Sequence, residues 1–236
     1  MATSIWLWSA ADVPHRDVLG EAERRRASAL REPLGSYFTA ARVAVRTVLG
    51  ELLGVPGGDV VLGNHPCPGC GDPGHGPPRV VWPETSLWIS ASRAEGYGAL
   101  AVSAAPVGVD IETHRPVDLP GLVRDALAPA EAVWLDGCTE PRERLLGFYR
   151  CWTRKEAVLK AVGVGMSVDL RRWDTEPGAE RGTVRDTTSG PARLWAVENP
   201  PSLADTTLAV GRPAEAAAQE GDVRVGTLSP ADGDRR

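Results

Sequence analysis

The chain has 236 residues, and 42% of them are hydrophobic, which is enough apolar material for the core of one domain or of two small ones. The formal net charge of −5 argues against a general nucleic-acid-binding protein. The sequence has no convincing membrane-spanning stretch and no positively charged secretion signal, so we expect a soluble cytoplasmic protein with neither a nucleic-acid nor a membrane partner.

The first part of the chain, to residue 105, predicts strands and helices in alternation. Along the chain we expect a Trp-rich strand over residues 4–9, a helical region from residue 21, a helix over 37–53, a Gly- and Pro-rich loop over 54–78, and a hairpin over 86–91 and 98–104. Arg42 and Arg46 lie one turn apart on the second helix.

The rest of the chain repeats this order. We expect a strand over 107–112, a mostly helical region to 162, strands over 192–197, 206–210 and 223–228, and a polar, disordered end over 229–236. Leu87-Trp88 precedes Leu100-Ala101-Val102 by thirteen residues, and Leu194-Trp195 precedes Leu208-Ala209-Val210 by fourteen. Either these common residues match by chance, or the chain is two similar α+β halves, 1–105 and 106–228, with an active site between them.

The loop over 54–78 contains two cysteines that are three residues apart, Cys67 and Cys70, with His65 and His75 nearby. Cysteine and histidine are the usual ligands of structural zinc, so a zinc knuckle is one interpretation. The chain has no second Cys pair of this kind, and the histidines do not fit a standard ligand spacing. These observations favour a plain turn.

A helix is expected from Pro141 to Gly163, because Pro is typical of a helix start and Gly of a helix end. Lys155 falls on the apolar stripe of this helix, while Glu156 and Lys160 lie one turn apart on another side. One interpretation is a lysine that reaches out of the core beside an ordinary surface ion pair. The other is a functional set of charged residues.

Asp110 and Glu112 are two residues apart on the strand over 107–112, so both side chains project from one face, with Val109 and Ile111 facing the core. Two like charges on one strand face repel each other, and a solvated edge strand could tolerate them. A divalent cation such as Mg²⁺ would remove the repulsion and would also bind phosphate oxygens. With Glu156 as a third carboxylate and lysines beside it, the pattern indicates a site for a metal-bound pyrophosphate and phosphoryl transfer.

Two motifs, Val107-Gly108-Val109-Asp110-Ile111-Glu112 and Trp152-Thr153-Arg154-Lys155-Glu156-Ala157-Val158-Leu159-Lys160, together resemble the paired signature of the 4′-phosphopantetheinyl transferases. The larger, surfactin-synthetase-activating (Sfp) type fits best. The resemblance implies a pseudo-two-fold α/β (α+β) fold of two similar halves, each with a small antiparallel sheet and helices. It also implies Mg²⁺-dependent transfer of the phosphopantetheine arm of coenzyme A to a serine of an apo carrier protein, with release of 3′,5′-ADP.

The same resemblance assigns roles to individual residues. It implies that Asp110, Glu112 and Glu156 bind Mg²⁺, that Glu156 is the general base, and that Lys155 and Lys160 lie near the phosphates of coenzyme A, the co-substrate. Asp110, Glu156 and Lys160 are therefore the expected catalytic residues. The expected partners are acyl or peptidyl carrier proteins of fatty-acid, polyketide or peptide synthases, and two halves in one chain make a monomer the default.

Several coenzyme A anchors of the family are missing. The usual Ser-His-Ser or Ser-His-Thr run reads Ser90-Ala91-Ser92, and the usual Gly-Lys-Pro reads Gly76-Pro77-Pro78. Losing two charge-assisted phosphate contacts would weaken coenzyme A binding by roughly two to four orders of magnitude. The residues that could still contact coenzyme A, besides the two lysines, are Ser90, Arg26, Arg42, Arg46 and Arg79.

Two alternative functions follow from these departures. One is a degenerate, non-catalytic relative that binds carrier proteins, and the other is a transferase with an altered donor such as dephospho-coenzyme A. Under every interpretation, the basic residues over 24–31 and over 150–154 are candidates to meet the acidic surface of a carrier protein.

Overall fold

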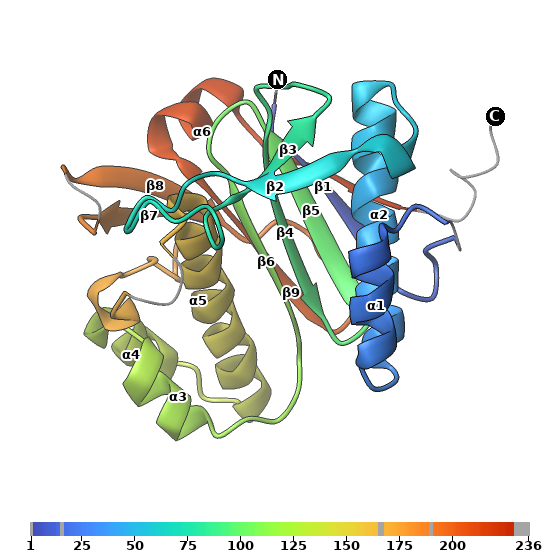
Figure 1. Ribbon diagram of the computed structural model, residues 1–236. Coiled ribbons are helices and arrows are strands. Elements are labelled where there is room, and N and C mark those ends of the chain that lie inside the picture. Colours follow the sequence, from blue (N-terminus) through green and yellow to red (C-terminus); the bar gives the residue numbers. More distant parts are fainter. Residues whose placement is uncertain (1, 15–16, 165–167, 189–190, 229–236) are drawn as a thin grey trace.

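Figure 1 shows the computed structural model, which describes residues 2–14, 17–164, 168–188 and 191–228. The end over 229–236, expected to be disordered, lies outside the described residues. The first half contains β1 (Ser4–Ser9), α1 (Glu21–Ala29), α2 (Leu34–Leu53), β2 (Val61–Asn64), β3 (Pro78–Trp82), β4 (Trp88–Ala94) and β5 (Tyr97–Ser103). The second contains β6 (Gly108–Thr113), α3 (Leu119–Ala126), α4 (Pro129–Asp136), α5 (Pro141–Val162), β7 (Arg181–Asp186), β8 (Arg193–Glu198), β9 (Thr206–Pro213), α6 (Ala214–Glu220) and β10 (Arg224–Thr227).

The two halves repeat one strand order, and the predicted mixed α/β fold is confirmed. One four-stranded sheet has the order β10-β1-β5-β4, the other has the order β6-β9-β8-β7, and β2 and β3 form a separate hairpin. In each four-stranded sheet the first strand of the half pairs antiparallel with the second strand of its hairpin, as β1 does with β5 and β6 with β9. The last strand, β10, returns to pair parallel with β1, so the chain end joins the first sheet.

Each sheet is covered by one long helix, and the two helices lie on opposite sides of the strands in Figure 1. Val45, Val48 and Leu49 of α2 pack on the first sheet, where they contact Leu100 and Val102. On the second sheet, α5 packs Val158 and Val162 against Val184, Trp195 and Val197. A third cluster joins the two sheets through Ile5, Leu7, Val109, Ile111 and Leu208.

Gly108 allows β6 to lie unusually close to α5. A Cβ atom at this position would stand 1.9 Å from the carbonyl oxygen of Ala157 and 2.5 Å from the backbone nitrogen of Ala161. No side chain fits in that space, because contacts this short are strongly repulsive. The glycine at the head of the aspartate motif therefore brings the carboxylates of β6 next to the charged face of α5.

Some elements differ from the expectation. The loop over 54–78 contains β2 and the first residue of β3, a hairpin that its Gly and Pro residues conceal. β7 was also missed, because its alternating burial uses Gly182 and Asp186 beside Val184 instead of a run of apolar side chains. α6 was not expected either. Among the described residues, no helix is long and apolar enough to cross a membrane.

Candidate active site at the seam between the halves

The carboxylates and lysine of the two motifs meet where β6 and α5 adjoin β4. Lys160 Nζ lies 2.7 Å from Asp110 Oδ1 and donates a 2.8 Å hydrogen bond to the hydroxyl of Ser92 on β4. The Ser92 hydroxyl in turn donates to Asp110 Oδ1 at 2.9 Å. Asp110 and Lys160 therefore belong to one hydrogen-bonded cluster, to which β4 contributes Ser92.

Burial and like charges raise the pKa values of the carboxylates in this cluster. The pKa of Glu156 rises to about 7, because the half-buried carboxyl group loses solvent and faces the charges of Asp110 and Glu112. The pKa of Glu112 is raised by the same two effects, with Asp110 as the neighbouring charge. Lys160 opposes both shifts, but it does not cancel them. The site therefore holds an excess of negative charge.

Trp152 of α5 holds the carboxylate of Glu112 on β6. Its indole nitrogen donates a hydrogen bond of 3.2 Å to Glu112 Oε1. Trp152 lies one turn before Glu156 on α5, so the helix positions both acids. The sequence indicated Trp152 as part of the motif but not this contact.

The residues of this cluster fit a hard divalent cation. The second carboxylate oxygen of Asp110 is buried and has no hydrogen-bond partner, which leaves a negatively charged atom available to a metal ion. Among the described residues, the three carboxylates do not all bring an oxygen within 4.8 Å of one another. Mg²⁺ typically binds one or two carboxylates directly and keeps several water ligands, so a further carboxylate can hold the ion through a water.

A hollow of about 660 Å³ opens beside this cluster, between α1, α2 and β4. This volume lies within the range of small-molecule sites. Its charged lining is strongly positive, with Glu23 as the one acid among the described lining residues. The cations are Arg26, Arg42, Arg46, Arg93 and Lys160. A positive hollow on a protein of net negative charge indicates an anionic ligand.

Three of these arginines surround one aromatic ring. The guanidinium carbons of Arg26, Arg42 and Arg93 lie 5.5, 5.3 and 5.3 Å from the centre of the Phe38 ring. Burial lowers the pKa of Arg42; Glu23 opposes this shift, and the neighbouring arginines add to it. This crowding of positive charge would be relieved by a bound anion. The sequence did not single out Arg93.

Arg46 is held at the wall of the hollow by two contacts. Its guanidinium is 2.9 Å from Glu23 and donates a 2.8 Å hydrogen bond to the carbonyl oxygen of Val60. Arg42 lies 3.4 Å from the other oxygen of Glu23. Glu23 therefore holds two arginines of α2 in place at the wall of the hollow.

A second hollow of about 270 Å³ adjoins the first. It is lined by Glu156 and by the loop segment His75 to Pro78, and the two hollows share Pro78, Ala91 and Lys160 in their linings. Lys160 therefore stands between an arginine-rich space and the carboxylates. The segment that replaces the usual Gly-Lys-Pro supplies no cation to this wall.

Lys155 lies outside this site. From the sequence we expected it near the phosphates of coenzyme A, and that expectation is not met. Its side chain is fully buried, with Nζ 2.7 Å from Glu131 Oε2. The ammonium group also donates hydrogen bonds to the carbonyl oxygens of Leu170 and Trp173. Glu131 accepts further bonds from the backbone nitrogen of Ala128 and from Thr175. Lys155 therefore ties α5 to α4 and to the segment after α5, and it does not reach out of the core.

Four other residues that the sequence analysis proposed for ligand or carrier binding are buried, bonded to the backbone, or outside the two hollows. The Ser90 hydroxyl is buried and accepts a hydrogen bond from the backbone nitrogen of Val109, although the residue lines the second hollow. Arg79 is exposed and lines neither hollow. Arg154 is fully buried, and its guanidinium donates to backbone carbonyl oxygens and to Asn199, so it cannot meet a carrier surface. Arg150 is partly buried and bonds to the carbonyl oxygens of Pro177 and Ala179.

Parts of this chain are similar in sequence to proteins named 4′-phosphopantetheinyl transferase. The chain is 31% identical over 148 residues to the 4′-phosphopantetheinyl transferase HetI of Nostoc sp., which covers 59% of this chain and 59% of HetI. It is 30% identical over 129 residues to the 4′-phosphopantetheinyl transferase psf-1 of Bacillus pumilus, covering 54% of this chain and 50% of psf-1. A shorter match, 37% over 83 residues, covers 42% of the 4′-phosphopantetheinyl transferase AcpT of Escherichia coli O157:H7 and 34% of this chain.

The chain thus spans about half the length of these relatives. A family model matches residues 106–210, the part that supplies the carboxylates of the site and Lys160. The region over residues 106–210 is therefore similar in sequence to the 4′-phosphopantetheinyl transferase superfamily.

Proposed function

We propose that this protein transfers the 4′-phosphopantetheine arm of coenzyme A to a serine of apo acyl or peptidyl carrier proteins, as an enzyme of the larger, surfactin-synthetase-activating type. The observation that carries the proposal is the cluster of three carboxylates and Lys160 beside a positive hollow large enough for a nucleotide. The relatives named 4′-phosphopantetheinyl transferase support the same activity.

In this proposal Asp110, Glu112 and Glu156 hold Mg²⁺, which supplies positive charge for a diphosphate when it is bound. Without a bound metal ion the pKa of Glu156 is about 7, close to neutral pH. This carboxylate is the group that accepts the proton of the attacking serine hydroxyl, directly or through water. The serine oxygen forms a bond to the β-phosphorus of coenzyme A. The bond from that phosphorus to the bridging oxygen breaks, and 3′,5′-ADP leaves with the electron pair.

Lys160 is placed to balance the charge that develops on the leaving diphosphate, because its ammonium lines both hollows and lies beside Asp110. The side chain is 30% exposed, so it is accessible from the hollow. Lys155 has no part in this proposal, since its ammonium is fully buried in the core.

The arginine-lined hollow is the proposed site of the 3′-phosphoadenosine part of coenzyme A. Ala91 and Arg93 lie two residues apart on β4, and both line the hollow. We propose that Arg93, together with Arg26 and Arg42, replaces the cation that the usual histidine would supply at position 91. The loss of affinity should then be smaller than the missing anchors alone would cause.

The acceptor is proposed to be a carrier protein with an acidic surface. Arg24 and Arg25 are exposed on α1, the helix whose Glu23 and Arg26 line the hollow, although each is paired with an acid, Asp17 or Glu21. Because both halves of the site lie in one chain, we propose that a monomer is sufficient for transfer.

The test of the proposal is transfer of a dye-labelled coenzyme A to an apo carrier protein by the wild-type protein and by Glu156→Gln. We expect labelling by the wild type and a rate at least about 100-fold lower in the variant, which is the usual contribution of a general base. Equal rates for both proteins would remove Glu156 from the mechanism. Tight carrier binding without any labelling would favour the non-catalytic alternative.

A further inference from the structure

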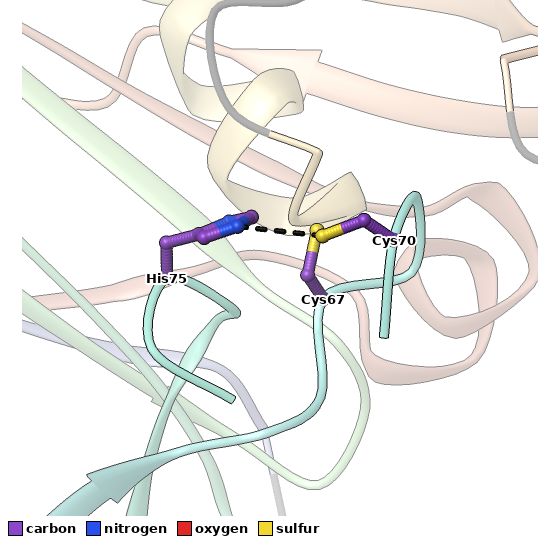
Figure 2. Close-up of side chains that lie close together, drawn as sticks. All are labelled: Cys67, Cys70 and His75. Atoms are coloured by element: carbon purple, nitrogen blue, oxygen red, sulfur yellow. Dashed lines mark hydrogen bonds between the residues drawn. The ribbon is translucent and has the colours of Figure 1, made fainter. Parts of the chain in front are cut away.

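A second group of metal-binding side chains lies in the loop between β2 and β3, outside the carboxylate cluster. Cys67, Cys70 and His75 each offer one ligand atom, and these atoms all lie within 4.8 Å of one another. Figure 2 shows the His75 ring pointing at the cysteine sulfurs, and Cys70 Sγ lies 3.3 Å from His75 Nε2. Ligand atoms around a tetrahedral zinc ion lie roughly 3.5 Å apart, given the usual zinc–sulfur and zinc–nitrogen distances.

The backbone already holds this loop in the shape that the three side chains require. The backbone nitrogen of Cys67 donates to the carbonyl oxygen of Asp72 at 3.0 Å, and that of Gly71 donates to the carbonyl oxygen of Cys67 at 2.7 Å. Gly71 has a φ of 78°, which suits glycine and closes the turn. His65, the other histidine near this loop, stacks on Trp88 with ring centres 4.4 Å apart.

We propose that Cys67, Cys70 and His75 bind a Zn²⁺ ion. Two thiolates and an imidazole are soft and borderline ligands that favour Zn²⁺ over Mg²⁺. Among the described residues, three side chains of these types converge, so the fourth position is left for water or for the Asp72 carboxylate, which lies 3.7 Å from His75 Nε2. The sequence favoured a plain turn because it could not show that the fold returns His75 to the cysteines.

The proposed ion would fix one wall of the second hollow. Cys67 is buried against the end of α5, with its sulfur 3.8 Å from the carbonyl oxygen of Gly163. His75 lines the second hollow together with Glu156 and Lys160. A zinc ion would therefore link the loop to the helix that carries the transfer residues. This inference does not depend on the proposed transferase activity.

The test is a titration of the reduced, metal-free protein with Co²⁺, which replaces Zn²⁺ and reports its ligands by absorption. We expect a thiolate-to-cobalt charge-transfer band that saturates near one ion per chain and disappears when Zn²⁺ is added. Co²⁺ bound at the carboxylate cluster would not give this band, so the two metal sites are distinguished. Glu112→Gln should leave the band unchanged.

Cys70→Ser is the informative variant, because Cys70 is exposed and its replacement does not disturb the core. We expect the band to be lost and the zinc affinity to fall at least about 100-fold, since even outer-sphere partners of a metal ligand contribute 10- to 100-fold. Cys138→Ser, which changes a cysteine outside the loop, should leave both properties unchanged.

A second measurement uses the wild-type protein alone. Zn²⁺ should slow the alkylation of Cys70 by iodoacetamide at least about 10-fold if the thiolate is a ligand. The proposal is overturned if the reduced protein gives no thiolate band, if the band survives in Cys70→Ser, or if Zn²⁺ leaves alkylation unchanged. A Cys67–Cys70 disulfide that reforms in the presence of Zn²⁺ would also overturn it and would assign the pair to redox chemistry.

Discussion

Lys155 and Lys160 lie five residues apart on one helix, and their ammonium groups have different partners. Lys155 is fully buried with Glu131, whereas Lys160 contacts Asp110 and lines both hollows. The apolar spacing of α5 correctly placed Lys155 on the buried stripe, but Glu131, its partner, is contributed by another helix. The geometry therefore separates a lysine buried in the core from the lysine that we propose takes part in transfer.

This separation predicts different outcomes for two matched variants. Lys155→Ala should destabilise the protein by about 3–5 kcal/mol, because it leaves the Glu131 carboxylate buried without its cation. Lys160→Ala should retain most of the stability and lose at least about 100-fold in transfer rate. Urea unfolding and transfer kinetics of both variants check this. A stable Lys155→Ala protein with a raised KM for coenzyme A would contradict it.

The raised pKa of Glu156 makes stability depend on pH. In the folded protein this pKa is about 7, against an ordinary value of 4.5, so between these values the folded state binds more protons than the unfolded state. Stability should therefore fall as pH rises from about 4.5 to 7 and should change little from this group above that range. This pH dependence is opposite to that of a carboxylate in a salt bridge, whose lowered pKa makes stability rise with pH.

Glu156→Gln should remove this contribution. In EDTA at pH 8 we expect the variant to be more stable than the wild type by about 1 kcal/mol, once solvent screening of a half-buried group is allowed for. The decrease of stability with rising pH that the raised pKa of Glu112 causes should remain in the variant. Urea unfolding at pH 5 and pH 8 measures both effects, with the exposed Glu84→Gln as control. A variant less stable than the wild type at pH 8 would refute this explanation.

At the scale of elements, the hollow depends on α1, α2 and β4 coming together around Phe38. Each element contributes one or more arginines, and no short stretch of sequence contains the set. Strand alternation places Arg93 beside Ala91, but only the packing of α2 on the sheet brings Arg42 to the same ring. The sequence motifs alone therefore indicated that contacts to coenzyme A are missing, because they do not show these arginines coming together.

The arginine cluster predicts how coenzyme A binding responds to substitution. Arg93→Ala should weaken binding by about 10-fold, the usual effect of losing one charge-assisted phosphate contact. The effect should be smaller for dephospho-coenzyme A, which lacks the 3′-phosphate. Calorimetric titration measures both ligands. Arg79→Ala is the control that separates the sequence-based candidates from the structural ones, and a larger loss in Arg79→Ala than in Arg93→Ala would contradict the assignment.

At the scale of the whole molecule, the repeat in the sequence corresponds to a repeated topology. Trp88 and Trp195 lie on β4 and β8, the equivalent hairpin strands of the two sheets. The period of two along β6 placed Asp110 and Glu112 on one face, and both residues are in the site. These features were predictable because they depend on local periodicity and on chain order.

The remaining features were not predictable because they depend on tertiary contacts. Three examples are the pairing of β10 with β1, the ion pair of Lys155 with Glu131, and the approach of His75 to the cysteines. Each brings together two segments, and the local periodicity of the sequence does not show that they meet. Burial of Arg154 is of the same kind, since its acceptors are backbone carbonyl oxygens of a later segment. A charged residue in a helical motif can therefore be structural even where its neighbours are functional.

The central claim is tested most directly by intact mass spectrometry of an apo carrier protein incubated with the wild-type protein and coenzyme A. We predict a gain of one phosphopantetheine in Mg²⁺ and no gain in EDTA, because the carboxylates require a cation to hold a diphosphate. A carrier that stays unmodified, across several carriers and with a protein shown to be folded, would contradict the transferase assignment. A gain of equal size in EDTA would contradict the role of the carboxylate cluster as a metal site.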